Sequence, residues 1–242
     1  MELKVNDLEK VVEEFKSEYY LTPKHRYASF DYCYNYFLRT EDLTKDIEKS
    51  CLVLGFYLAS WGMFRGSSFL LEKSIKYFER TIKYIANRPK SDWKIDVDNY
   101  DSDNNIATII KIYSDIKDIL ITEDNAHLTL VTKILLGVFG FVPAFDKYFG
   151  DAFRVIAKDD KNGFRVLNAE SLTFIKRFYE ANKDSIDKLS NQTHTIDFLT
   201  GKETDINYTK AKIIDMYGFT IEFEKAKKIK EEKIKKKMNN NA

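Results

Sequence analysis

The chain has 242 residues, of which 44% are hydrophobic and 14% aromatic, and its 39 Lys and Arg residues nearly balance 38 Asp and Glu residues. This apolar content is sufficient for a sizeable core and excludes an intrinsically disordered chain. Residues 51–64, the longest apolar run, are too few for a membrane span of about 20 residues. Because the chain has two cysteines and no apolar leader after Met1, we expect a cytoplasmic protein without disulfides.

Apolar residues recur at spacings of three and four along nearly the whole chain, a pattern typical of amphipathic helices. We therefore predict an all-α fold, an irregular bundle of about nine to ten helices without a significant sheet. Asn6 and Glu9 have the spacing of a capping box and predict the start of the first helix. Proline fits the first turn of a helix, so Thr22-Pro23 predicts the end of that helix and the start of the second. The apolar stripes of the successive helices span residues 8–19, 27–37, 47–61, 71–85, 106–120, 128–138, 145–156 and 172–179.

Three segments between or after these stripes have a less regular pattern. Residues 91–105 predict a polar loop, 159–163 an exposed turn, and 190–205 either a loop or an ordered excursion. Gly218 is expected to separate two terminal helices. We predict one domain over residues 1–224 and a Lys-rich helix end or tail over 225–242.

Sequence signatures of catalysis and cofactor binding are absent. The chain contains no phosphate-binding glycine loop, no His-Glu-x-x-His pair and no Gly-x-Ser-x-Gly elbow. Three scattered histidines and two cysteines lack metal-ligand spacing. The acidic stretch from Asp101 has Ile106 and Ile112 where a calcium loop needs glycine and glutamate. We therefore expect no metal and no cofactor, and we assign no catalytic residue.

The most unusual segment runs from Gly55 to Leu71 and is rich in small residues. Gly55, Ala59, Gly62 and Gly66 recur at steps of four, three and four, which would leave one face of a helix nearly bare. A second helix, or a ligand, could then approach the backbone closely. The favoured interpretation is a close helix crossing at these four residues.

A charged residue lies on the core stripe of the same helix. Arg65 follows Trp61 by one turn, so we expect its guanidinium to be buried and to need a carboxylate partner. Asp146 or another carboxylate is the expected partner. Asp146 lies between aromatic residues in the first turn of a later helix, where a carboxylate also interacts favourably with the positive end of that helix. Together with Tyr148 and Arg154, these three residues form our candidate ligand-binding set.

Two of these runs, 55–71 and 142–149, resemble segments of an uncharacterised family of bacterial all-α proteins with no assigned activity. The resemblance implies a bacterial helical domain and suggests an association with phage defence or mobile elements. It implies no catalytic residue, substrate or mechanism.

Positive charge is concentrated near the C-terminus, whereas the remainder of the chain is mildly acidic. We therefore expect no nucleic-acid surface spread over the body, but the terminal lysines could make weak, non-specific contacts with phosphates. Three functions follow as hypotheses: a binding protein for another protein or a small ligand, an enzyme with a pocket at Arg65, Asp146 and Tyr148, and a nucleic-acid accessory protein. The sequence does not predict the oligomeric state and is compatible with a homo-oligomer. The lysines of the terminal segment are Lys225, Lys227, Lys228, Lys230, Lys233, Lys235, Lys236 and Lys237.

Overall fold

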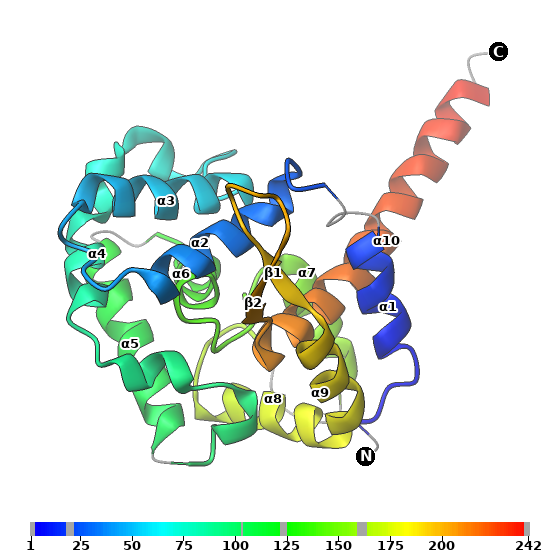
Figure 1. Cartoon of the computed structure of the whole chain (residues 1–242). Helices are drawn as coiled ribbons and strands as arrows, with labels where there is room; N and C mark the ends of the chain where they lie inside the picture. The colour runs from blue at the N-terminus through cyan, green and yellow to red at the C-terminus, as the bar shows by residue number, and fades with distance from the viewer. Residues whose placement is uncertain (1–2, 18–21, 103, 122–124, 159–163, 240–242) are drawn as a thin grey trace.

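Helices dominate the computed structural model of the chain, which describes residues 3–17, 22–102, 104–121, 125–158 and 164–239, with side chains described up to residue 232. The described part contains ten α-helices and one small antiparallel hairpin, which confirms the all-α prediction (Figure 1). No helix in it has the length and apolar character needed to cross a membrane. The α-helices are α1 (Leu8–Phe15), α2 (Ser29–Arg39), α3 (Ile47–Ser60), α4 (Glu79–Ala86), α5 (Asn105–Leu120), α6 (Leu128–Phe139), α7 (Lys147–Ile156), α8 (Ala169–Ala181), α9 (Lys183–Gln192) and α10 (Lys210–Asn239).

Short 3₁₀ helices occur in two segments for which the sequence predicts a different structure. The predicted helix over 71–85 is divided into η3 (Phe69–Glu72), η4 (Ile75–Phe78) and α4. The predicted polar loop over 91–105 contains η5 (Lys90–Lys94) and η6 (Val97–Asn99) and buries Tyr100 in the core. The predicted turn at 159–163 lies outside the described residues.

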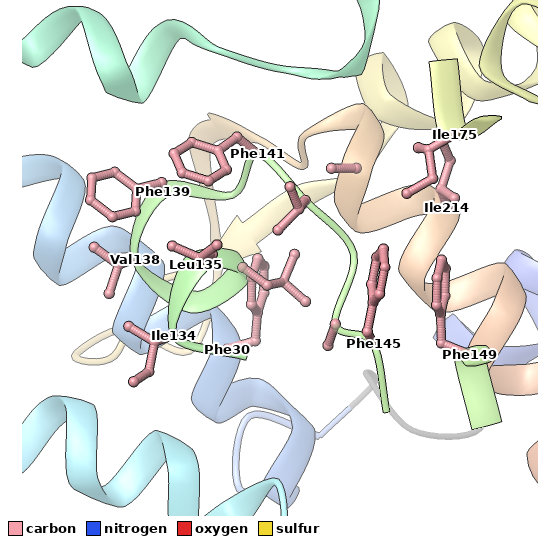
Figure 2. Close-up of a cluster of buried hydrophobic side chains, with 14 of the residues drawn as sticks. Phe30, Ile134, Leu135, Val138, Phe139, Phe141, Phe145, Phe149, Ile175 and Ile214 are labelled. Carbon is pink, nitrogen blue, oxygen red and sulfur yellow. The ribbon is translucent and has the colours of Figure 1, made fainter. Parts of the chain in front are cut away.

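Helix α6 forms the centre of the bundle. Every residue from Leu130 to Phe139 is buried, and α2, α3 and α5 pack around it. Figure 2 shows the core continuing from the α6 side chains through Phe141 and Phe145 toward Phe149 and the facing helices α8 and α10. One connected apolar core therefore joins the two halves of the chain.

Two glycines allow close packing against this core. A Cβ atom at Gly137 of α6 would collide with the Tyr57 ring of α3, and one at Gly218 of α10 would lie 2.7 Å from the Phe149 ring of α7. The prediction that Gly218 separates two terminal helices is therefore wrong, because α10 is continuous from Lys210 to Asn239. The predicted boundary at residue 225 likewise lies within this helix, whose distal part extends away from the bundle (Figure 1).

The predicted helix crossing at Gly55, Ala59, Gly62 and Gly66 is wrong for three of the four residues. Helix α3 ends at Ser60, and Gly62 and Gly66 adopt left-handed backbone conformations with φ of 80° and 60°. Ala59 is exposed. Of the four residues, Gly55 alone is buried in the helix. A Cβ atom added there would lie 3.5 Å from Cγ2 of Ile75, an ordinary van der Waals contact. Glycine permits a positive φ without steric cost, so the small residues after Ser60 form the turn that ends the helix.

The irregular segment 190–205 contains the start of a hairpin. Strand β1 (His194–Ile196) pairs with β2 (Glu203–Asn207), in a register that places His194 opposite Asn207 and Ile196 opposite Glu203. The hairpin lies in front of α2 in Figure 1, and its first strand contacts that helix. Of the two predicted alternatives, a loop and an ordered excursion, the segment forms the ordered excursion.

Candidate functional site

The predicted ion pair between Arg65 and Asp146 does not form. Arg65 is exposed, because the chain leaves the helical path at Gly62 and no longer follows the core stripe. Asp146 instead caps the N-terminus of α7, accepting a hydrogen bond from the Phe149 amide, and its Oδ2 lies 3.1 Å from Nζ of Lys133. The candidate ligand set is therefore not assembled around Arg65.

The other members of that set lie in two different environments. Trp61 is half-buried and contacts Lys133. Tyr148 packs edge-on against Phe219, 5.2 Å between ring centroids. Arg154 pairs with Asp151 on the same helix. Trp61, Asp146 and Tyr148 are thus half-buried at the edge of the core, whereas Arg154 belongs to a local pair with Asp151.

Two buried lysines flank the Trp61 ring. The Lys212 ammonium lies 4.7 Å from the ring centroid and that of Lys133 lies 5.1 Å from it. Each lysine has a carboxylate partner, since Lys212 Nζ is 2.9 Å from Oδ2 of Asp215 and Lys133 pairs with Asp146. Asp215 is also held by the Ala144 amide, 3.0 Å from its Oδ1. The two cations and two carboxylates are balanced, and we refer to these four residues and Trp61 as the lysine cluster.

The two lysines of the cluster are closed to solvent, and their arrangement fits a structural role. The Lys212 side chain is 0% exposed and that of Lys133 5%. Neither lysine nor its partner lines the surface pocket under the hairpin. Paired charges of this kind hold the elements that carry them in one arrangement, because breaking a pair leaves an uncompensated charge in the interior.

A third carboxylate, Asp31 of α2, is buried beside this cluster without a cation of its own. Its Oδ1 accepts a hydrogen bond of 2.6 Å from the Tyr208 hydroxyl, and its Oδ2 has no partner among the described residues. Burial raises the pKa of Asp31 from the ordinary 3.8 to about 8, against the opposing effects of the Tyr208 hydrogen bond and the Lys212 charge. Asp31 is therefore mainly protonated at neutral pH.

Asp31 lies where the hairpin meets the bundle, and neighbouring polar contacts fix that junction. The Asn35 side chain of α2 donates to the Ile196 carbonyl (3.0 Å) and accepts from the Thr195 hydroxyl (2.6 Å). Thr195 is 0% exposed, so these hydrogen bonds are shielded from water. Arg39, at the end of α2, forms an ion pair with Asp205 of β2 at 2.7 Å. The hairpin is thus fixed to the bundle along its length.

The hairpin loop is well defined and displays two large apolar side chains. Asp197 accepts hydrogen bonds from the Leu199 and Thr200 amides and from the Thr200 hydroxyl; these bonds, from Thr200 foremost, lower the pKa of Asp197. Gly201, with φ of 64°, closes the turn. Phe198 is 72% exposed and Leu199 is 89% exposed. We call Phe198 and Leu199 the hairpin tip.

A surface pocket of about 340 Å³ lies under the hairpin, between its strands and the end of α1. Its lining combines opposite charges with hydroxyl groups and a few apolar side chains. Glu13 and Lys16 of the α1 end form an ion pair at 3.1 Å across its rim. The charged and polar lining residues include Glu13, Lys16, Thr193, His194, Glu203 and Tyr208.

The Lys-rich end is partly neutralised by its own helix. Lys225 lies 2.6 Å from a carboxylate oxygen of Glu222, and Lys227 lies 3.8 Å from one of Glu224. The side chains of Lys233, Lys235, Lys236 and Lys237 lie outside the described part. The structure thus gives no specific support to a nucleic-acid site here.

The sequence contained signals for several of the residues that we missed. Lys133 is the single charge in the apolar stretch 128–142, and Lys212 and Asp215 have ion-pair spacing within another apolar stretch. A charge inside such a run indicates a buried pair. Nothing in the local sequence indicates that Phe198 and Leu199 are exposed, because that depends on where the hairpin is anchored.

Comparison with known proteins adds no relationship: no family model, curated protein or solved structure matches the chain.

Proposed function

We propose that this chain is an interaction protein that docks on a partner protein through the hairpin tip. The observation that carries the proposal is the exposure of Phe198 and Leu199 on an ordered, anchored turn. Large apolar side chains that protrude together suit insertion into an apolar groove of another protein. The partner surface that matches them is therefore concave and apolar.

The rigidity of the turn strengthens this proposal. Three hydrogen bonds to Asp197 set the loop conformation before any partner arrives, and the ring of Phe198 rests edge-on against Tyr32 at 5.1 Å. A preorganised loop loses little conformational entropy on binding, so more of the apolar contact contributes to affinity. The buried contacts of Asn35 and Thr195 act in the same direction because they fix the strands behind the tip.

Other exposed apolar side chains do not combine these features. Phe56 is 70% exposed and Leu52, one turn away, is 48% exposed, but both lie on the side of helix α3 and do not protrude on a turn. The remaining exposed large apolar residues among those described are single ones: Leu71, Val155, Val166 and Ile229. Scattered apolar residues are normal on protein surfaces. Phe56 therefore provides a matched control for Phe198, with the same side chain and nearly the same exposure.

The cytoplasm is the proposed location. Cys33 and Cys51 are both free and buried, which is compatible with a reducing compartment.

Site-specific photo-crosslinking tests the docking proposal. A photoreactive phenylalanine analogue is placed at position 198 or at position 56, and the protein is irradiated in cells of the organism that encodes it. We expect a discrete crosslinked species from position 198 that disappears when Leu199→Ser is added, and no equivalent species from position 56. Equal products from the two positions, or none from position 198, would contradict docking by the hairpin tip.

A further inference from the structure

The hairpin is attached to the bundle by polar contacts rather than by the apolar core. Residues 194–207, all of which the structure describes, contribute no buried apolar side chain, and the next core residue along the chain, Tyr208, follows β2 directly. The attachments to α2 are hydrogen bonds and an ion pair, made by Asp31, Asn35 and Arg39. Segments with few buried apolar contacts open locally at a lower free energy than the core. We therefore expect the hairpin to open before the bundle unfolds.

The carboxyl group of Asp31 lies between α2 and the base of the hairpin. Asp31 is in the first turn of α2 and is fully buried. Its Oδ1 accepts the hydrogen bond from Tyr208, and the Tyr208 amide donates to the Thr193 carbonyl at 2.8 Å, which closes the base of the hairpin. The backbone of Ile196 in β1 also acts on the carboxyl group. Opening of the hairpin would therefore bring this group into contact with water.

The charged groups around this junction leave Asp31 without a cation of its own. Lys212 is the cation whose charge acts on Asp31, but its ammonium pairs with Asp215. The Asp31 charge also raises the pKa of Tyr32 on the same helix. Oδ2 of Asp31 has no hydrogen-bond partner among the described residues. The other charged or titratable groups on elements that contact α2 have partners elsewhere or are exposed: Lys133 of α6 with Asp146, His194 of β1 near Glu203, Arg26 with Tyr27 in η2, and the exposed Glu48 and Lys49 of α3.

We propose that Asp31 is a proton-dependent latch for the hairpin: the protonated carboxyl group keeps the hairpin on α2, and loss of the proton favours the opened hairpin. A carboxylate is costly to bury with one oxygen unpartnered, whereas in the opened form water solvates both oxygens. Burial raises the pKa of Asp31 to about 8, against the opposing effects of Tyr208, Lys212 and Ile196, which agrees with a protonated group in the closed form. As regulation of the hairpin tip the inference rests on the proposed function, but the opening is a property of the free chain.

Proton linkage gives the direction and the size of the effect. Between the ordinary pKa of 3.8 and the raised value of about 8, the closed form holds a proton that the opened form releases. In this window the equilibrium constant for opening should rise about tenfold per pH unit, and it should be constant above pH 8. A two-stranded hairpin is marginally stable by itself, so the opened hairpin also loses its internal hydrogen bonds. Its amides then exchange with solvent.

Amide hydrogen exchange of the full chain, without any partner, tests the latch. Protection factors, from which the intrinsic pH dependence of exchange is divided out, are measured from pH 5 to pH 9. The probes are the Tyr208 amide and the Asp197 amide, which donates to the Lys202 carbonyl at 2.8 Å, with the buried Leu135 of α6 as the reference for global unfolding. We expect the two hairpin amides to be less protected than Leu135, and their protection to fall about tenfold per pH unit up to pH 8. In Asp31→Asn their protection should not change with pH.

Asp205→Asn is the matched control, because it removes an exposed carboxylate of the same hairpin. Loss of its ion pair with Arg39 should lower the hairpin protection by a constant factor and leave the pH dependence as in the wild type. Hairpin amides as protected as Leu135, hairpin protection in the wild type that does not change with pH, or a pH dependence that persists in Asp31→Asn would overturn the inference. The first two outcomes decide the matter even if Asp31→Asn does not fold. Failure of docking is distinguished by crosslinking from position 198, which the exchange measurement does not involve.

Discussion

Replacement of Asp31 by Asn removes a buried carboxyl group that has no cation of its own among the described residues. The asparagine oxygen can still accept the hydrogen bond that Tyr208 donates to Oδ1. The substitution therefore changes the titration of the site much more than its shape, and its effect should appear as a change in how stability depends on pH.

The sign follows from the raised pKa. Because folding raises the pKa of Asp31 from 3.8 to about 8, the folded state retains a proton that the unfolded state releases above about pH 4. The contribution of this group is favourable below the unfolded pKa and is lost progressively as pH rises toward 8. The loss approaches about 1.4 kcal/mol per pH unit, so the wild type should lose about 2.5 kcal/mol relative to Asp31→Asn between pH 5 and pH 7.

Urea unfolding of the two proteins at pH 5, 6, 7, 8 and 9 measures this difference. The free energy of unfolding of the variant relative to that of the wild type should rise at each step up to pH 8, and the difference should become constant above pH 8. Asp118→Asn, which removes an exposed carboxylate of α5, should parallel the wild type throughout. A difference between wild type and Asp31→Asn that does not change with pH would show that Asp31 is ionised in the folded protein and would refute the reasoning.

Three further predictions concern the interior and the terminal helix. Lys212→Met should lower the free energy of unfolding by about 3–5 kcal/mol, because it leaves the Asp215 carboxylate buried without its cation; urea unfolding measures the loss. Gly137→Ala should cost about 1–3 kcal/mol in the same assay, because the new Cβ atom would collide with the Tyr57 ring. Removal of residues 225–242 should leave the melting temperature nearly unchanged and should abolish any retention on nucleic acid at low salt.

Each of these has a control and a contrary outcome. The double variant Lys212→Met/Asp215→Asn should recover at least half of the loss, and no recovery would mean that the cation stabilises through the aromatic rings instead. Gly55→Ala, where the added Cβ meets only ordinary contacts, should be neutral or stabilising. A large loss of stability on truncation would show that the terminal segment packs on the core, contrary to what the 53% exposure of Ile229 indicates.

Periodicity predicted the helical class because most helices of this chain carry a regular apolar stripe on one face. It failed at residue 61, where the stripe extrapolates to Arg65 but the backbone turns at Gly62 with a positive φ. Spacing alone does not distinguish a glycine that packs within a helix from one that ends it. For the same reason a helix boundary was predicted at Gly218, which lies within α10.

The charged residues show a related limit. Asp146 was correctly expected at the start of a helix among aromatic side chains, but its partner is Lys133 rather than Arg65. Choosing between two cations requires the path of the chain between residues 61 and 133, which no local pattern contains. The hairpin tip was missed for the same reason, since its exposure depends on contacts between α2 and β1 that are about 160 residues apart in sequence.

The affinity of the protein for the partner recovered from position 198 tests docking by the hairpin tip most directly. Isothermal titration calorimetry compares the wild type with Phe198→Ser and Phe56→Ser, two substitutions of side chains that are 72% and 70% exposed. Burial of one phenylalanine contributes roughly 1.5–3 kcal/mol, so Phe198→Ser should weaken binding by about 10- to 100-fold while Phe56→Ser binds like the wild type. Equal affinities for all three proteins would contradict the proposed docking surface.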